Sequence, residues 1–208
     1  MDYEAVIEEA IRLGYQSGMV DGSRLSLEEN IGATRKIAEM AHAADIPVEG
    51  ELGAVLGHED GPLPPYEELF ASGKGFTALE DAKRFVDEAK VDWLSVAVGN
   101  VHGAISGVVR HSKKVEAKLN LEHLERIYSA VHIPLVLHGG SGIKKDYIQG
   151  AIQRGIAKIN IGTAIRQPYE AALKHSAATA KKVLEATMRI LSQDLEPQGS
   201  RQKVNPEA

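Results

Sequence analysis

The sequence predicts an α/β protein with a parallel sheet, an incomplete TIM (β/α)8 barrel of about five βα units. Short apolar runs bounded by Gly or Pro alternate with segments whose apolar residues recur every three to four positions. This order implies right-handed crossovers between parallel strands. A complete barrel typically needs about 250 residues, whereas this chain has 208 and opens with a helical pattern. We therefore expect strands four to eight of a barrel.

The first unit is predicted from a helix followed by a short strand. Apolar side chains share one helical face over residues 2–13, and Gly14 ends that helix. A strand is expected at residues 17–21, although Gly18 should weaken its pairing.

Two capping boxes predict the next two helices. Residues 26–29, Ser-Leu-Glu-Glu, open a helix that runs to about residue 44, and a strand is expected at residues 47–51. Residues 77–80, Thr-Ala-Leu-Glu, form the second box. The buried stripe of the helix after it comprises Ala82, Phe85, Val86 and Ala89.

The C-terminal half continues the alternation. Further strands are expected at residues 93–98, 134–138 and 158–161. Further helices are expected at residues 120–130, 145–154 and about 164–193. We predict one domain over residues 1–195 and a disordered Gln-, Pro-, Gly- and Lys-rich tail over 196–208. The long loops 53–76 and 99–119 are either active-site lids or dispensable insertions.

Composition excludes several classes of protein. A formal net charge of −5 and a pI near 5.9 argue against nucleic-acid binding, because proteins that bind nucleic acids usually present a basic surface. No apolar run approaches the roughly 20 residues that span a bilayer, and the N-terminus lacks a signal-peptide pattern. The absence of cysteine excludes disulfides and thiolate metal sites. A cytoplasmic protein is expected.

Two histidines end neighbouring predicted strands and form the candidate active site. His102 and His138 each follow an apolar run, at the sheet edge where parallel α/β proteins hold ligands. Two imidazoles with a carboxylate from Glu51 or Asp21 suit a zinc ion that keeps one position open for substrate. The alternative is a pair of histidines that bond to barrel loops without a metal.

A glycine-rich run lies directly beside His138. Residues 139–142, Gly-Gly-Ser-Gly, can bring backbone amides close to an anion, and Ser141 adds a hydroxyl. The last strand ends in residues 158–163, Lys-Ile-Asn-Ile-Gly-Thr, where the free amides of a helix start favour a phosphate. The alternative is two tight turns with a helix cap at Thr163.

Four motifs in order resemble the class II, metal-dependent fructose-bisphosphate aldolases and the related tagatose-bisphosphate aldolases. The motifs are Val-Glu-Gly-Glu-Leu-Gly at 48–53, Gly-Asn-Val-His-Gly at 99–103, Leu-His-Gly-Gly-Ser-Gly at 137–142 and Lys-Ile-Asn-Ile-Gly-Thr at 158–163. The resemblance extends over roughly residues 2–175. It implies a TIM barrel that reversibly cleaves fructose or tagatose 1,6-bisphosphate to dihydroxyacetone phosphate and glyceraldehyde 3-phosphate, as in glycolysis. It also implies one or two zinc ions, replaceable by other divalent metals, and a homodimer or homotetramer.

The resemblance also assigns roles to residues of this chain. His102 and His138 match two zinc-binding histidines, Glu51 and Asp21 match carboxylates of an alternative or second metal position, and Glu59 matches the acid that moves the carbon-bound proton. The residues that match the dihydroxyacetone phosphate site are Gly103, Gly139, Gly140, Ser141, Asn160, Gly162 and Thr163.

One part of the family pattern is missing from the sequence. The third zinc histidine and the catalytic aspartate belong to a His-x-Asp-His motif, which does not occur in these residues. We therefore expect little activity from this chain alone. The rival hypothesis is a non-catalytic sugar-phosphate-binding or assembly module derived from the barrel. A third hypothesis is that the native protein starts upstream.

Overall fold

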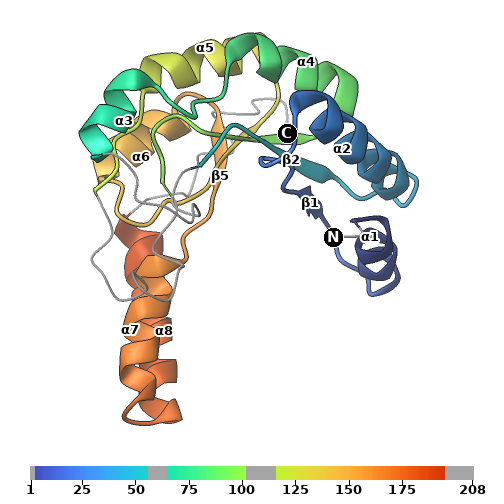
Figure 1. The fold of residues 1–208 in the computed structure, drawn as a ribbon. Coiled ribbons are helices and arrows are strands. Elements are labelled where there is room, and N and C mark those ends of the chain that lie inside the picture. Colours follow the sequence, from blue (N-terminus) through green and yellow to red (C-terminus); the bar gives the residue numbers. More distant parts are fainter. Residues whose placement is uncertain (1–2, 56–64, 102–115, 195–208) are drawn as a thin grey trace.

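The computed structural model describes residues 3–55, 65–101 and 116–194 and contains one parallel sheet (Figure 1). Its strands are β1 (Gly18–Val20), β2 (Val48–Leu52), β3 (Trp93–Val96), β4 (Leu135–Leu137) and β5 (Ile156–Ile159). They lie side by side in chain order, and every neighbouring pair is parallel. Five parallel strands alternating with helices confirm the predicted α/β class. Within the described residues β1 and β5 are the two edges, and the sheet does not close into a barrel.

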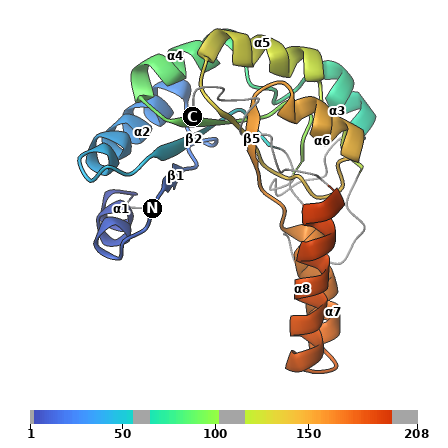
Figure 2. The same cartoon turned by 180° about the vertical axis from the view of Figure 1, so that it is seen from behind.

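Most of the helices line the convex side of the curved sheet (Figures 1 and 2). The helices are α1 (Tyr3–Arg12), α2 (Leu27–His42), α3 (Tyr66–Ser72), α4 (Leu79–Ala89), α5 (Leu121–Val131), α6 (Lys145–Ile152), α7 (Thr163–Leu173) and α8 (Ala177–Asp194). The last two pair with each other and project away from the sheet. No helix among the described residues is long and apolar enough to cross a membrane.

The hydrophobic core lies between the strands and the helices on the convex side. Its fully buried large side chains include Phe85, Leu94, Leu124, Ile127 and Leu135. Gly50 of β2 belongs to this side, because a Cβ there would lie 2.6 Å from the Phe85 ring. Side chains alternate along a strand, so Glu49 and Glu51 point to the opposite, concave side. The core therefore determines which face carries the charged residues.

The two predicted capping boxes have different outcomes. Ser26 caps α2 as expected: its hydroxyl accepts from the Glu29 N–H, and the Glu29 carboxylate accepts from the Ser26 N–H at 3.0 Å. The second box is wrong. Ala78 is the N-cap of α4 and makes no side-chain cap bond, because the Thr77 hydroxyl instead donates to the Leu52 carbonyl at 2.6 Å.

Three element boundaries also differ from the sequence prediction. The helix expected at 164–193 is two helices, because the Ser176 hydroxyl accepts from the Thr179 N–H at 3.1 Å and starts α8 anew. The loop expected at 53–76 contains α3, and β5 starts two residues before Lys158. The predicted tail 196–208 and most of the loop 99–119 lie outside the described residues.

Candidate functional site

The imidazole of His138 lies between two glutamates of β2. Its Nε2 is 2.8 Å from Glu49 Oε1, and its Nδ1 is 3.0 Å from Glu51 Oε2. His138 is 5% exposed, Glu49 0% and Glu51 2%. Because the strands are parallel, the carboxyl ends of β2 and β4 lie at the same edge of the sheet, so Glu51 and the residue that follows β4 meet there.

Lys158 of β5 completes this charged cluster. Its Nζ lies 2.6 Å from Glu49 Oε2 and 5.9 Å from the centre of the Trp93 ring. Burial raises the pKa of Glu49, but hydrogen bonds from His138 and Lys158 outweigh burial and hold the pKa below its ordinary value. Burial lowers the pKa of His138, but hydrogen bonds to Glu49 and Glu51 outweigh it and raise the pKa to about 9. The protein therefore stabilises an imidazolium here.

Three buried polar side chains hold the strand ends around this cluster by bonding to backbone. The Asn30 amide donates to the Glu51 carbonyl at 2.9 Å. The Thr77 hydroxyl, besides its bond to β2, accepts from the Ala97 N–H at 2.8 Å and so joins the ends of β2 and β3. The Asn100 amide donates to the His138 carbonyl at 3.0 Å and joins the ends of β3 and β4.

The predicted phosphate-binding segments also meet in the structure. The Ser141 hydroxyl accepts from the Ala164 N–H of α7 at 3.1 Å, and the Gly140 N–H donates to the Asn160 carbonyl at 2.9 Å. Gly162 is the N-cap of α7 and makes no side-chain cap bond, so Thr163 is not the cap. A hydroxyl that accepts a hydrogen bond keeps its own hydrogen, so Ser141 can still donate to an anion.

Close packing restricts the glycine loop beside His138. Gly139 has a φ of 67°, a backbone conformation that glycine adopts at low cost. A Cβ at Gly140 would lie 2.6 Å from Cγ2 of Ile159 in β5. The glycines therefore allow the loop after β4 to lie directly against the end of β5.

The predicted metal ligands are only partly brought together. Glu51 and His138 are adjacent, whereas Asp21 is exposed and its Oδ1 accepts from the Ser23 hydroxyl at 2.6 Å. Within residues 3–55, 65–101 and 116–194, no group of three or more His, Asp or Glu residues could hold a metal ion. His102, with Gly103 and Glu59, lies outside the described residues.

The two described donors nevertheless fit a zinc ion. Two ligands of a tetrahedral zinc ion with bonds of about 2.0–2.1 Å lie roughly 3.3 Å apart. His138 Nδ1 and Glu51 Oε2 are 3.0 Å apart, which is close to that spacing, and they combine an imidazole nitrogen with a carboxylate oxygen. A small movement, with loss of the proton on Nδ1, would admit the ion between them.

Sequence reasoning missed Glu49. The signal is present, since two glutamates alternate with glycine in an otherwise apolar strand and must share one face. His42 of α2 and His123 of α5 also make side-chain contacts. His42 Nε2 lies 2.9 Å from Asp92, and His123 Nε2 lies 2.8 Å from the Thr77 carbonyl.

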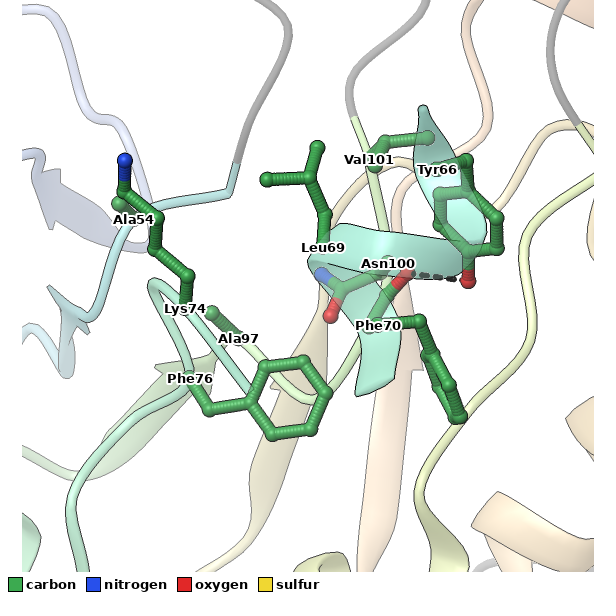
Figure 3. A pocket seen from close by; sticks show the side chains of 10 residues that line it. Ala54, Tyr66, Leu69, Phe70, Lys74, Phe76, Ala97, Asn100 and Val101 are labelled. Carbon is green, nitrogen blue, oxygen red and sulfur yellow. Dashed lines mark hydrogen bonds between the residues drawn. The ribbon is translucent and has the colours of Figure 1, made fainter. Parts of the chain in front are cut away.

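A small pocket lies beside the ends of β2 and β3 (Figure 3). Its wall is mainly apolar and aromatic, with Leu69, Phe70 and Phe76 among the lining residues. The Tyr66 hydroxyl donates to the Gly99 carbonyl at 2.9 Å and accepts from the Lys118 N–H at 2.6 Å. The side chains around this pocket pack α3 against the segment that follows β3. We therefore assign the candidate metal and substrate chemistry to the charged cluster of His138, Glu49, Glu51 and Lys158.

Comparisons with known proteins agree with the fold and the motifs. The family model "Fructose-bisphosphate aldolase class-II" matches residues 2–200. The fructose-bisphosphate aldolase of Streptococcus pyogenes serotype M3 is 42% identical over 163 residues, which cover 77% of this chain and 50% of that protein. The 6-phospho-5-dehydro-2-deoxy-D-gluconate aldolase of Shouchella clausii is 37% identical over 187 residues, with coverages of 90% and 58%.

Solved structures give the same result. The YdjI aldolase from Escherichia coli K12 is 32% identical with a TM-score of 0.73, over 97% of this chain and 68% of that one. A putative fructose-1,6-biphosphate aldolase from Coccidioides immitis is 28% identical with a TM-score of 0.75, over 95% and 69%. The chain spans about half the length of the curated relatives it matches. It belongs to the class II fructose-bisphosphate aldolase family.

Proposed function

We propose that this chain provides the metal-binding and phosphate-binding part of a class II aldolase active site. The reaction is the reversible cleavage of fructose or tagatose 1,6-bisphosphate to dihydroxyacetone phosphate and glyceraldehyde 3-phosphate. The observation that carries the proposal is the 3.0 Å approach of His138 to Glu51 at the carboxyl ends of their strands. The glycine loop directly after His138 contacts the start of α7 through the hydrogen bond between Ser141 and Ala164. The family match supports the aldol chemistry.

The metal would be held by His138 and Glu51, with His102 and Asp21 as the further predicted ligands. Zinc held there would supply a Lewis acid that lowers the cost of negative charge on the ketone oxygen. Cobalt or iron could occupy the same ligands. Glu59 is proposed to transfer the proton at the carbon next to the carbonyl, which requires its carboxylate to come within hydrogen-bond reach of that position.

The phosphate of dihydroxyacetone phosphate would lie between the loop after β4 and the start of α7. Ser141 donates its hydroxyl hydrogen to a phosphate oxygen, and the first-turn amides of α7 add their dipoles. The remaining proposed substrate-binding residues are Gly103, Gly139, Gly140, Asn160, Gly162 and Thr163.

The proposal is tested with purified chain supplied with zinc. We expect zinc binding at one to two ions per chain, zinc-dependent proton exchange on dihydroxyacetone phosphate, and cleavage of both ketose bisphosphates far below an ordinary enzymatic rate. Ser141→Ala should weaken binding of dihydroxyacetone phosphate, whereas Ser192→Ala in α8 should leave it unchanged. A chain that binds neither zinc nor dihydroxyacetone phosphate would contradict the proposal.

A second candidate is a non-catalytic sugar-phosphate-binding or assembly module. The open sheet favours it, because β1 and β5 are edge strands among the described residues and Met19 of β1 is 43% exposed. This hypothesis predicts a metal-free homo-oligomer, whereas the leading one predicts bound zinc in a dimer or tetramer. Size-exclusion chromatography with metal analysis distinguishes the two.

A further inference from the structure

The ring of His138 is held differently at its two nitrogens. Glu51 lies nearer the carboxyl end of β2 than Glu49 does. Nδ1 of His138 therefore faces the carboxyl ends of the strands, and Nε2 faces the middle of the sheet. A group that binds Nδ1 would replace the contact with Glu51. Nε2 would keep its contact with Glu49.

Both oxygens of Glu49 are engaged by side chains of the cluster. Oε1 lies 2.8 Å from His138 Nε2, and Oε2 lies 2.6 Å from Lys158 Nζ. The carboxylate is fully buried, and these two charge-assisted bonds offset the cost of its desolvation. The Lys158 ammonium also lies over the Trp93 ring, which limits its movement.

We propose that Glu49, fixed by Lys158, is a positioning residue that directs Nδ1 of His138 towards the strand ends. It acts through the histidine and touches neither metal nor substrate. A carboxylate that accepts the N–H of a metal-binding imidazole sets the tautomer and orientation of that ring. The inference rests on the proposed role of His138 as a metal ligand.

Zinc affinity in the presence of a competing chromogenic chelator provides the first test. Glu49→Ala should weaken zinc binding by about 10- to 100-fold, the usual effect of losing such a partner. Glu49→Gln keeps an oxygen that can accept from Nε2–H, so it should recover part of the loss. Lys158→Met should weaken binding less than Glu49→Ala. Lys118→Met, which removes a surface ion pair with Glu67, should leave affinity unchanged. Equal zinc affinity in wild type and Glu49→Ala would overturn the proposal.

Nuclear magnetic resonance of the zinc-free chain provides a second test. The Nε2–H proton of His138 should resonate at low field and exchange slowly with water in the wild type. It should move upfield in Glu49→Gln and disappear in Glu49→Ala, while a folded backbone spectrum is retained. An unchanged resonance in Glu49→Gln contradicts the proposal even if Glu49→Ala fails to fold.

The two tests separate this inference from the proposed function. A wild type that binds no zinc but shows the Glu49-dependent Nε2–H signal contradicts the metal site and retains the orienting contact. A wild type that binds zinc with an affinity independent of Glu49 retains the metal site and contradicts the positioning role.

Discussion

His138 should make the stability of the chain depend on pH. Its pKa is raised from 6.5 to about 9, so the folded chain holds the imidazolium proton more tightly than the unfolded chain does. The stability contributed by this group is complete below 6.5 and is lost as the pH rises through about 9. One pKa unit corresponds to about 1.4 kcal/mol, so this shift contributes about 3 kcal/mol to the free energy of unfolding.

Glu49 sets the acid limit of the same stability range. Its pKa is held below the ordinary 4.5, so its contribution is complete above 4.5 and is lost as the pH falls further. The charged cluster should therefore stabilise the fold most between 4.5 and 6.5, where both contributions are complete.

Urea unfolding at a series of pH values, with a chelator present, tests this reasoning. The free energy of unfolding of the wild type should fall by about 3 kcal/mol between its maximum and the pH at which His138 deprotonates. His138→Asn should remove most of that decline. Glu51→Gln should move it to lower pH, because one carboxylate that stabilises the imidazolium is gone. His132→Asn, at the exposed end of α5, should retain it. A wild-type free energy that stays constant over this interval would refute the argument.

Three further substitutions test the contacts that shape the site and its scaffold. Asn100→Asp replaces the amide donor that faces the His138 carbonyl and should cost about 1–3 kcal/mol in urea unfolding; an unchanged midpoint would exclude a role for that bond. Thr77→Val leaves the Leu52 carbonyl without its hydroxyl donor and should also cost about 1–3 kcal/mol of unfolding free energy. Thr77→Ser keeps the hydroxyl and should cost less. Equal losses in the two variants would show that the methyl group matters instead. Ser26→Ala removes the cap of α2 and should lower the free energy of unfolding by about 1 kcal/mol without changing zinc affinity. Calorimetry measures the stability and chelator competition measures the zinc affinity; a lower zinc affinity would contradict this expectation.

The strand–helix alternation and the residues at strand ends were predictable from sequence. Apolar runs place β2, β3 and β4 correctly, and the parallel topology brings Glu51 beside His138. Both results follow from local periodicity and from the rule that parallel strands end at the same edge of a sheet.

Contacts between distant parts of the chain were not predictable from local pattern. Thr77 matches a helix cap in sequence, yet its hydroxyl bonds two strand ends because the end of β3 lies within reach. The Ser176 cap, which divides a long amphipathic pattern into two helices, is by contrast a local contact that the periodicity masked. Glu49 contacts His138, just after β4, and Lys158 of β5, which are 89 and 109 residues away from it in sequence.

The bond between Lys158 and Glu49 has a consequence for the curvature of the sheet. It joins β5 to β2 across the concave side, although β3 and β4 separate these strands in the sheet. Such a contact requires an arc, because the side chains of a flat sheet would not span that distance. The ammonium–carboxylate pair therefore resists flattening of an open sheet whose edge strands have no outer neighbour among the described residues.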